Sequence, residues 1–466
     1  MQKYSHFFCK KVGGYELFFS LRFNFFYIEV SFLKKKVLPL CKILTKHSSM
    51  KKSKFLLLAV TFLAVVSTAV AEKKNDVTRS LHTGKHRQEI IIPKVCGYNV
   101  YKADLHTHTI YSDGSVTAPW RLREAWFDGL DILAITDHME YRRIERNLIK
   151  YMGAYIKEEY RHLAKGVNTN LQGENDKPDE HGILVDMNVG YEEALESNEQ
   201  YGLLVVRGVE ITRNQGHYNA IFTQDNNKIY DPDIRKAIKN AVDQGAFVFQ
   251  NHPKRNPDTK TKMTPLAEEM YEKGYVKGTE IGNGHAFWGW LVPHCMNNGL
   301  APISNSDGHA SIAERFYPYY NDGAYRNMTL ILAKKCDEKS IKEALFAGRT
   351  IAYHSNKLVG KEEYLVDLFK NSVTIEHQCD TKKSTLVTLT NRCSFPYELK
   401  WGKNATAVVG AMGAIQISLP KGAESVEFTI TNLITGGKKR AKVTLNFKRK
   451  PDNEYLKAEP NRWFPY

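Results

Sequence analysis

The stretch A-D-L-H-T-H-T-I-Y-S-D-G, residues 103–114, carries the first signal of the fold. Its histidines His106 and His108 are separated by one residue, and alternate residues of a strand point to the same side. Asp113 follows five residues after His108. An H-x-H pair alone is a weak signal, because any strand with two histidines shows it. The pair becomes informative through the motifs that follow it along the chain.

Further potential metal ligands recur downstream in the motifs T-D-H, R-G-V-E-I-T, Q-N-H-P and S-N-S-D-G-H. Seen singly, T-D-H or N-H-P is more often a hydrogen-bonded loop histidine than a ligand. The complete candidate set is His106, His108, Asp113, His138, Glu210, His217, His252, Asp307 and His309. Imidazole and carboxylate groups suit zinc, manganese and iron, and several of both can hold more than one ion. The set therefore predicts a metallohydrolase.

The candidate ligands follow or accompany apolar runs that are typical of buried strands. These runs are residues 131–135, 203–209, 218–222, 246–249 and 301–303. Helical patterns lie between them and after them, at residues 117–126, 186–199, 231–244, 264–273 and 338–347. Such alternation predicts an α/β fold with a parallel sheet closed into a barrel, whose strand ends are where active sites are built.

With these motifs in this order, the chain resembles the PHP (polymerase and histidinol phosphatase) superfamily. The resemblance implies a distorted (β/α)7 barrel over about residues 101–358 and hydrolysis of phosphate esters with two or three divalent ions, Zn, Mn or Fe. It also implies that Glu210 bridges two ions, with His106, His108 and Asp307 around one of them. The remaining histidines and Asp113 would complete the other sites, and Glu210, Asp113 and His217 are the expected catalytic residues.

Neighbours of the ligands are candidates for supporting roles. Three are expected to orient imidazoles by hydrogen bonds: Asp104, Asp137 and Asn251. Four cationic residues are candidates for contact with the substrate phosphate, although each could equally be a surface charge: Arg213, Lys254, Arg142 and Arg143.

The substrate class has three alternatives. A phosphodiesterase is favoured. The chain has a predicted export signal and a β-rich C-terminal region, both described below, and with these features it looks most like the bacterial Sb-PDE family phosphodiesterases. A diester carries one negative charge and two organic arms, so its site needs more apolar or aromatic wall. Candidate wall residues, which could also be ordinary packing, are Trp288, Trp290, Phe316, Tyr317, Tyr319 and Tyr320. The alternatives are a phosphomonoesterase resembling histidinol phosphatase and a non-catalytic metal-binding receptor or scaffold.

A signal peptide is predicted at residues 50–71. Lys51, Lys52 and Lys54 precede an apolar run at residues 55–66, and Ala69-Val70-Ala71 matches a cleavage site. The run is shorter than the ~20 residues that span a bilayer, although a membrane anchor or a buried amphipathic helix is the alternative. Residues 1–49 are interpreted as a mis-set upstream start, with a long basic leader as the alternative. A periplasmic or secreted protein without a stable membrane anchor is expected.

Removal of residues 1–71 changes the charge of the chain. The whole chain carries +15, but this segment holds twelve Lys or Arg and two Glu, which leaves +5 for the remaining 395 residues. Nucleic-acid binding through a large basic field is therefore not favoured, and a small-molecule phosphate ester is the expected partner. Five cysteines remain, of which Cys379 and Cys393 could close a hairpin, with buried free thiols as the alternative.

Three further regions complete the predicted organisation. Residues 72–100 form a lead-in, and residues 145–190 form a charged insertion that either walls the site or is a surface excursion. Beyond residue 361 the helical signals fade. Strands are predicted at residues 373–377, 384–390, 414–419, 425–431 and 441–447. This pattern predicts a small antiparallel β-sandwich over residues 361–466.

Overall fold

The computed structural model describes residues 86–140, 186–253, 263–313 and 324–449, together with the backbone of residues 6–12, 15–21 and 28–32. The predicted signal peptide, residues 72–85 of the lead-in, residues 145–185 of the insertion, and Arg142, Arg143 and Lys254 lie outside the described residues. Cleavage, export and the roles of these residues stay predictions. Within the described part of the chain, every helix is too short or too polar to cross a membrane.

The first unit, Met1–Val77, contains a three-stranded sheet. Its strands β1 (His6–Val12), β2 (Tyr15–Leu21) and β3 (Ile28–Phe32) pair antiparallel in that order. The sequence shows no steady alternation of apolar and polar residues here. Phe and Tyr, which are frequent in this segment, favour strands through their shape rather than through such alternation.

The second unit, Thr78–Tyr466, begins with a barrel. Its strands are β4 (Asn99–Asp104), β5 (Ile132–Ile135), β6 (Leu204–Arg213), β7 (Gly216–Ile221), β8 (Phe247–Gln250), β9 (Val276–Asn283), β11 (Ala301–Asn305) and β12 (Met328–Ala333). Strands β4, β5 and β6 are parallel, as are β8, β9 and β11. The prediction of an all-parallel sheet is wrong at two places. Strand β7 runs antiparallel to both neighbours, and β12 runs antiparallel to β4.

The connection between β6 and β7 explains the first difference. Only Asn214 and Gln215 join these strands, and a two-residue connection can join antiparallel strands but not parallel ones. The barrel closes between β11 and β12 through Thr329, whose hydroxyl accepts from the Ser304 amide and donates to the Ser304 carbonyl, both at 3.0 Å. The fold is the predicted distorted (β/α)7 barrel.

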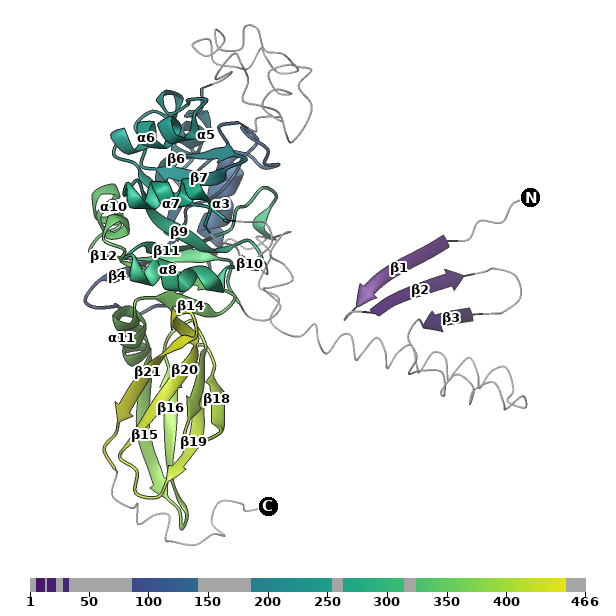
Figure 1. Cartoon of the computed structure of the whole chain (residues 1–466). Coiled ribbons are helices and arrows are strands. Elements are labelled where there is room, and N and C mark those ends of the chain that lie inside the picture. Colours follow the sequence, from purple (N-terminus) through teal and green to yellow (C-terminus); the bar gives the residue numbers. More distant parts are fainter. Residues whose placement is uncertain are drawn as a thin grey trace. The chain divides into compact units, whose positions relative to one another are not determined.

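Helices cover the outside of the barrel (Figure 1). The five predicted helices are confirmed as α3 (Ala118–Phe127), α5 (Val189–Glu196), α6 (Ile234–Asp243), α7 (Pro265–Glu272) and α10 (Glu338–Phe346). Thr117 caps α3 by accepting from the Trp120 amide, and Thr264 caps α7 in the same way, each with a proline in the first turn. The short elements β10 (Ala286–Phe287), η3 (Asn226–Lys228), η4 (Gly289–Leu291) and α8 (Val292–Asn297) were not predicted.

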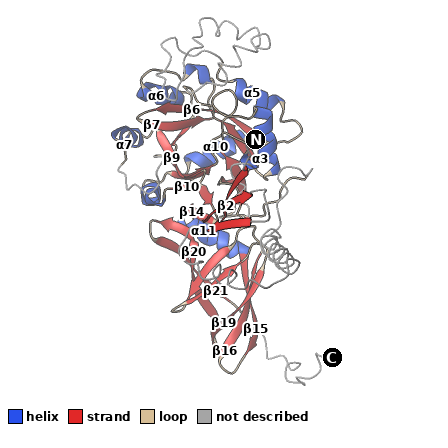
Figure 2. Cartoon of the chain, turned by 90° about the vertical axis from the view of Figure 1, so that its right-hand side faces the viewer, coloured by secondary structure: helices blue, strands red, loops and turns tan. Residues whose placement is uncertain are grey.

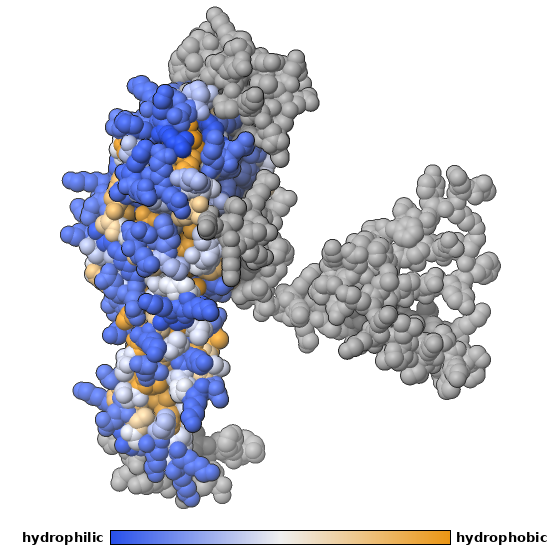
Figure 3. All heavy atoms as spheres, in the orientation of Figure 1, coloured by the Kyte–Doolittle hydropathy of each residue, from blue (hydrophilic) through white to orange (hydrophobic). Residues whose placement is uncertain are grey.

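The barrel interior is packed with apolar side chains. Leu105, Phe247, Phe249 and Ile303 are fully buried in one cluster, and each such side chain contributes about 1.5–3 kcal/mol of transfer free energy. In Figure 3 hydrophilic residues cover most of the barrel surface on the viewed side, which agrees with the burial of apolar side chains in the interior. The ligands therefore lie on a packed scaffold.

The remainder of the unit is rich in antiparallel strands, as predicted (Figure 2). Strands β13 (Thr350–His354) and β14 (Lys357–Gly360) extend the barrel sheet, and β14 pairs in parallel with β20. The strands that follow are β15 (Val373–Asp380), β16 (Ser384–Asn391), β17 (Tyr397–Trp401), β18 (Ala405–Val409), β19 (Ala414–Pro420), β20 (Ser425–Gly436) and β21 (Lys439–Asn446). Strands β15, β16 and β19 form a separate sheet.

One expectation for this region was wrong, and one open alternative is decided. A helix, α11 (Glu362–Ser372), lies where the helical signals were expected to fade. It buries Leu365, Leu368 and Phe369, so packing stabilises it. Cys379 and Cys393 are free thiols, with Cys393 buried, which corresponds to the alternative to a disulfide.

Candidate metal centre

The structure brings all nine candidate ligands to one edge of the barrel. Most of them follow the carboxyl end of a strand: His106 and His108 follow β4, His138 follows β5, His252 follows β8, and Asp307 and His309 follow β11. Asp113 lies in the loop before α3. Glu210 lies within β6, and His217 opens β7. Because β7 is antiparallel, its amino end lies at the same barrel edge as the carboxyl ends of its neighbours.

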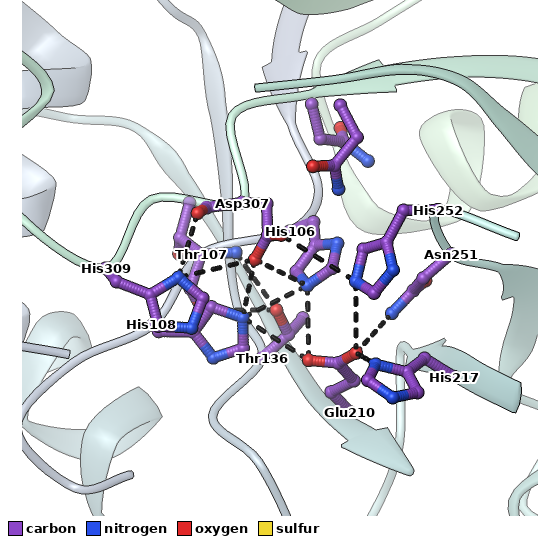
Figure 4. Close-up of polar contacts among 12 residues, drawn as sticks. His106, Thr107, His108, Thr136, Glu210, His217, Asn251, His252, Asp307 and His309 are labelled. Carbon is purple, nitrogen blue, oxygen red and sulfur yellow. Dashed lines mark hydrogen bonds and ion pairs between the residues drawn. The ribbon is translucent and has the colours of Figure 1, made fainter. Parts of the chain in front are cut away.

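Glu210 lies at the centre of the cluster and its two carboxylate oxygens face different histidines (Figure 4). Its Oε2 lies 3.3 Å from His106 Nε2, 3.3 Å from His108 Nε2 and 3.0 Å from His138 Nδ1. Its Oε1 lies 3.0 Å from His217 Nδ1 and 3.8 Å from His252 Nε2. This division is the arrangement expected of a carboxylate that bridges two ions.

The ligand atoms form four overlapping groups, in each of which all atoms lie within 4.8 Å of one another. The groups are His108, Asp113, His138 and His309; His106, His252 and Asp307; His106, His108 and Glu210; and Glu210, His217 and His252. Imidazole nitrogens and carboxylate oxygens that converge in this way fit divalent transition metals. Asp307 also groups with His106 and His252, and its Oδ1 lies 3.1 Å from His108 Nε2 and 3.3 Å from His106 Nε2. These contacts agree with the place beside His106 and His108 that the resemblance implied.

The electrostatics of the cluster favour charged carboxylates. Burial acts to raise the pKa of Glu210, but the neighbouring His138 and His106 outweigh burial and hold this pKa well below its usual value. Burial also acts to lower the pKa of His138, yet Glu210 and Asp113 raise it to about 9. Burial and the adjacent His309 and His138 lower the pKa of His108 to about 3. A neutral imidazole at His108 is the form that binds a metal ion.

Glu280, which the sequence analysis did not assign, supports two ligands. This buried carboxylate of β9 accepts from His106 Nδ1 at 2.9 Å and from the His252 amide at 2.8 Å. Asn305 and Asn283 donate to its two oxygens at 2.9 and 2.8 Å. The hydrogen bond from Nδ1 to Glu280 leaves His106 Nε2 facing the cluster. Metal-binding histidines are commonly oriented in this way, by a carboxylate that accepts from the ring nitrogen that does not bind the metal. A carboxylate within the strand V-K-G-T-E-I-G-N was the available sequence signal.

The three residues predicted to orient imidazoles have other partners. Asn251 donates to Glu210 Oε1 at 2.9 Å, so it fixes the central carboxylate. Asp137 accepts from the amide and hydroxyl of Thr109 and from the Ser112 hydroxyl, all within 2.7 Å, and thereby fixes the loop that carries Asp113. The hydroxyl of Thr212, which was not predicted, lies 2.8 Å from His138 Nδ1.

Asp104 supports the loop that follows β11. It accepts from the amide and the hydroxyl of Ser306 at 3.2 and 2.5 Å, and it forms an ion pair with the buried Arg326. Asp104 therefore fixes the backbone next to Asp307 instead of an imidazole, because it is the last residue of β4 and its carboxylate meets Ser306, which follows β11. The expectation that it orients a histidine was wrong.

Arg213, the one candidate phosphate contact among the described residues, is already engaged. Its guanidinium forms a buried ion pair with Glu140 and donates to the carbonyls of Thr212 and Asp231 at 3.0 Å. Trp288 is only 2% exposed, which corresponds to the alternative that it packs in the barrel wall, and Trp290 is half-buried. The other proposed wall residues, Phe316, Tyr317, Tyr319 and Tyr320, lie outside the described residues.

Comparison with known proteins agrees with this geometry. Residues 104–278 match the model of the PHP domain. A two-domain protein from Bacteroides vulgatus, described as containing a predicted PHP-like metal-dependent phosphoesterase, shares 29% identity, with a TM-score of 0.65, over 78% of this chain and 99% of its own. A comparison with curated proteins finds no match.

Other solved structures resemble the chain more weakly. An amidohydrolase from Chromobacterium violaceum shares 15% identity over 45% of this chain and 87% of its own, with a TM-score of 0.29. A lesion-specific endonuclease from Pyrococcus furiosus shares 15% identity over 57% of this chain and 60% of its own, with a TM-score of 0.32.

The fold and the ligand cluster define a barrel with sites for several metal ions. Residues 104–278 match a PHP domain, and the chain as a whole, with its strand-rich second domain, is similar to the two-domain protein that contains a predicted PHP-like metal-dependent phosphoesterase.

Proposed function

We propose that the chain is a metal-dependent phosphodiesterase. The observation that carries the metal dependence is the position of Glu210, whose two oxygens face separate sets of histidines at 3.0–3.8 Å. Divalent ions at such a site would supply a hydroxide at neutral pH and neutralise charge on the phosphoryl oxygens. The nine ligands would hold them, since both donor types are present in every overlapping group.

The protein groups around the ligands keep the centre in one arrangement. Asn251 fixes the rotamer of Glu210, Glu280 fixes the ring of His106, and Thr212 bonds the ring of His138. Such preorganisation matters because a displacement of about 1 Å in a catalytic group can cost two orders of magnitude in rate. Two ligands, His217 and His309, have side chains that are 31% and 32% exposed, so the cluster is open to solvent on their side.

The preference for diesters is supported by the charges that the described residues leave for a substrate. A dianionic monoester favours a site with cationic side chains in addition to the metals, whereas a diester carries a single charge. The Arg213 guanidinium is paired with Glu140, so its charge is already compensated. Arg142, Arg143 and Lys254 lie outside the described residues, and their variants belong in the same assay.

The test compares bis-p-nitrophenyl phosphate with p-nitrophenyl phosphate, which share a leaving group. We expect a higher kcat/KM for the diester with Mn²⁺, Zn²⁺ or Fe²⁺ and loss of turnover after chelation. Arg213→Ala should leave the ratio of the two substrates unchanged. A clear preference for the monoester would contradict the proposal and favour a phosphomonoesterase, and metal binding without turnover of either ester would favour a non-catalytic receptor or scaffold.

A further inference from the structure

Arg121 is a fully buried arginine that the proposed chemistry does not use. It lies in α3, next to two segments that carry ligands: the first ligand loop, residues 105–113, and the second ligand loop, residues 306–312. Its side chain is 0% exposed, and Glu124 beside it is 1% exposed. A buried guanidinium loses its hydration, so it persists only where protein groups replace the water.

Protein groups use all of the donors of Arg121. Its Nε and Nη2 donate to the His108 carbonyl at 3.2 and 3.0 Å, and Nη2 also donates to the Gly308 carbonyl at 2.9 Å. Its Nη1 donates to the Ala310 carbonyl at 3.0 Å and to Glu124 Oε2 at 2.8 Å. A guanidinium has five N–H donors, so each of them has a partner. The acceptors belong to both ligand loops and to α3.

Glu124 extends the same contact. Its Oε1 accepts from the Ser311 hydroxyl at 2.7 Å and from the Ile312 amide at 2.8 Å. The second ligand loop also approaches Arg121 closely at Gly308, where a Cβ would lie 3.2 Å from Nη1 and 2.8 Å from Ile312 Cδ1. The pair therefore holds the second ligand loop at several points and the first at His108.

The conformation of the second ligand loop needs such support. Asp307 has φ of +50°, in the left-handed region, where a residue other than glycine has a higher energy. Backbone bonds join the loops at Asp307 N to His106 O, 3.0 Å, and at His108 N to Gly308 O, 3.1 Å. With the loops in this register, His309 Nε2 lies 3.2 Å from Asp113 Oδ1.

Two of the four metal-ligand groups take ligands from both loops and so depend on this register, and one group takes none from either loop. The clamped group, His108, Asp113, His138 and His309, takes ligands from both ligand loops. The distal group, Glu210, His217 and His252, takes none from either loop. We propose that Arg121 and Glu124 are positioning residues that set the metal affinity of the clamped group and leave that of the distal group unchanged. The proposal rests on the metal binding in the proposed function.

The test measures Mn²⁺ and Zn²⁺ binding to the metal-free full chain by equilibrium dialysis, with metal per chain determined by elemental analysis. In Arg121→Lys, the ammonium has three donors for the contacts that five donors make. We expect about 10–100-fold weaker binding at the clamped group, the usual effect of losing a group that supports ligands, and unchanged binding at the distal group. Variants His309→Ala and His217→Ala assign the binding phases to the two groups.

The matched control is Arg349→Lys, which also changes an arginine that bonds one carbonyl, Leu332 at 3.2 Å, and one carboxylate, Glu343 at 2.9 Å. It should bind metal like the unchanged chain. If Arg121→Lys does not fold, Glu124→Gln decides the question. It keeps the size of the side chain and replaces one acceptor oxygen by a donor, so about 3–10-fold weaker binding at the clamped group alone is expected.

Three results are distinguishable. An unchanged chain that binds no metal would refute the proposed function itself. If the unchanged chain binds metal and Arg121→Lys or Glu124→Gln binds it equally well at the clamped group, only the proposed positioning role of Arg121 and Glu124 would be refuted. Equal weakening at both groups would also overturn the clamp, since a general loss of stability acts on the whole centre and not on one group.

Discussion

Replacement of Glu280 by glutamine tests how far the centre depends on a carboxylate that faces no substrate. The substitution keeps the volume of the side chain and creates no cavity. It converts one of two acceptor oxygens into an NH₂ donor, although Glu280 accepts four hydrogen bonds, two at each oxygen. The two N–H groups that donate to the replaced oxygen would then face the new NH₂ group, which is itself a donor.

The structure indicates where the new NH₂ group will lie. On the Oε2 side it would meet the His252 amide, a backbone donor that cannot reverse. On the Oε1 side it would meet Asn305, whose own oxygen is held by the Leu105 amide at 2.9 Å, and His106 Nδ1. An imidazole can exchange its tautomer. The NH₂ group should therefore face His106, which moves the ring proton to Nε2 and blocks the nitrogen that faces the cluster.

The expected cost follows from these contacts. Each hydrogen bond to a charged acceptor contributes about 1.5–3 kcal/mol, so the metal-free variant should be destabilised by about 3 kcal/mol or more. Metal affinity should fall about 10–100-fold, as for other groups that orient a metal-binding histidine. Titration of the metal-free protein with Zn²⁺, together with urea unfolding, measures both quantities. Glu269→Gln, on the surface of α7, is the control. Metal affinity within about threefold of the unchanged chain would refute the tautomer argument.

Three other predictions concern the same centre. Glu210→Gln should lose bound metal and turnover together, while His86→Ala, whose residue is exposed and outside the cluster, should lose neither; full metal content in the Glu210 variant, by elemental analysis, would contradict the bridging role. The metal-free protein should be most stable near pH 6.5. The pKa of His108 is about 3 in the fold against 6.5 unfolded, so its contribution to stability rises with pH between these values, whereas His138, with a folded pKa of about 9, contributes stability that is lost from pH 6.5 to 9. Urea midpoints that do not change between pH 5 and 9 in a chelator would refute this. Asp137→Asn should weaken the hydrogen bonds from Thr109 and Ser112 and reduce metal affinity at Asp113. Asp243→Asn, on the surface, is the control, and unchanged metal binding would show that the loop keeps its conformation without Asp137.

The sequence predicted those features that depend on local signals. Strands such as Phe247–Gln250 are short apolar runs that end at a polar motif, and helices such as α3 begin at a capping threonine followed by proline. The order of these elements was enough to indicate the barrel. The ligand motifs follow strand ends, and parallel strand ends meet at one edge, so their proximity could also be anticipated.

The grouping of the ligands could not be anticipated, because it depends on loops that are distant in sequence. Asp307 contacts both His108, at 3.1 Å, and His252, at 3.7 Å, because its backbone has positive φ and is bonded to the His106 carbonyl. Glu280 and Arg121 escaped notice for a related reason. A single charge in a strand or helix usually faces solvent, and only the packed structure shows that these two are surrounded by donors or acceptors.

The pairing of β14 with β20 has a consequence for how the chain can be divided. Leu358 aligns with Leu433 and Val359 with Ile434, and the last two share a buried cluster with Val292 of α8. A chain truncated after Gly360 would keep every ligand but would leave β14 as an unprotected edge strand with unpaired amides and an apolar face. Such edges recruit other strands and cause aggregation. The barrel and its strand-rich tail are therefore expected to fold and unfold as one inseparable body.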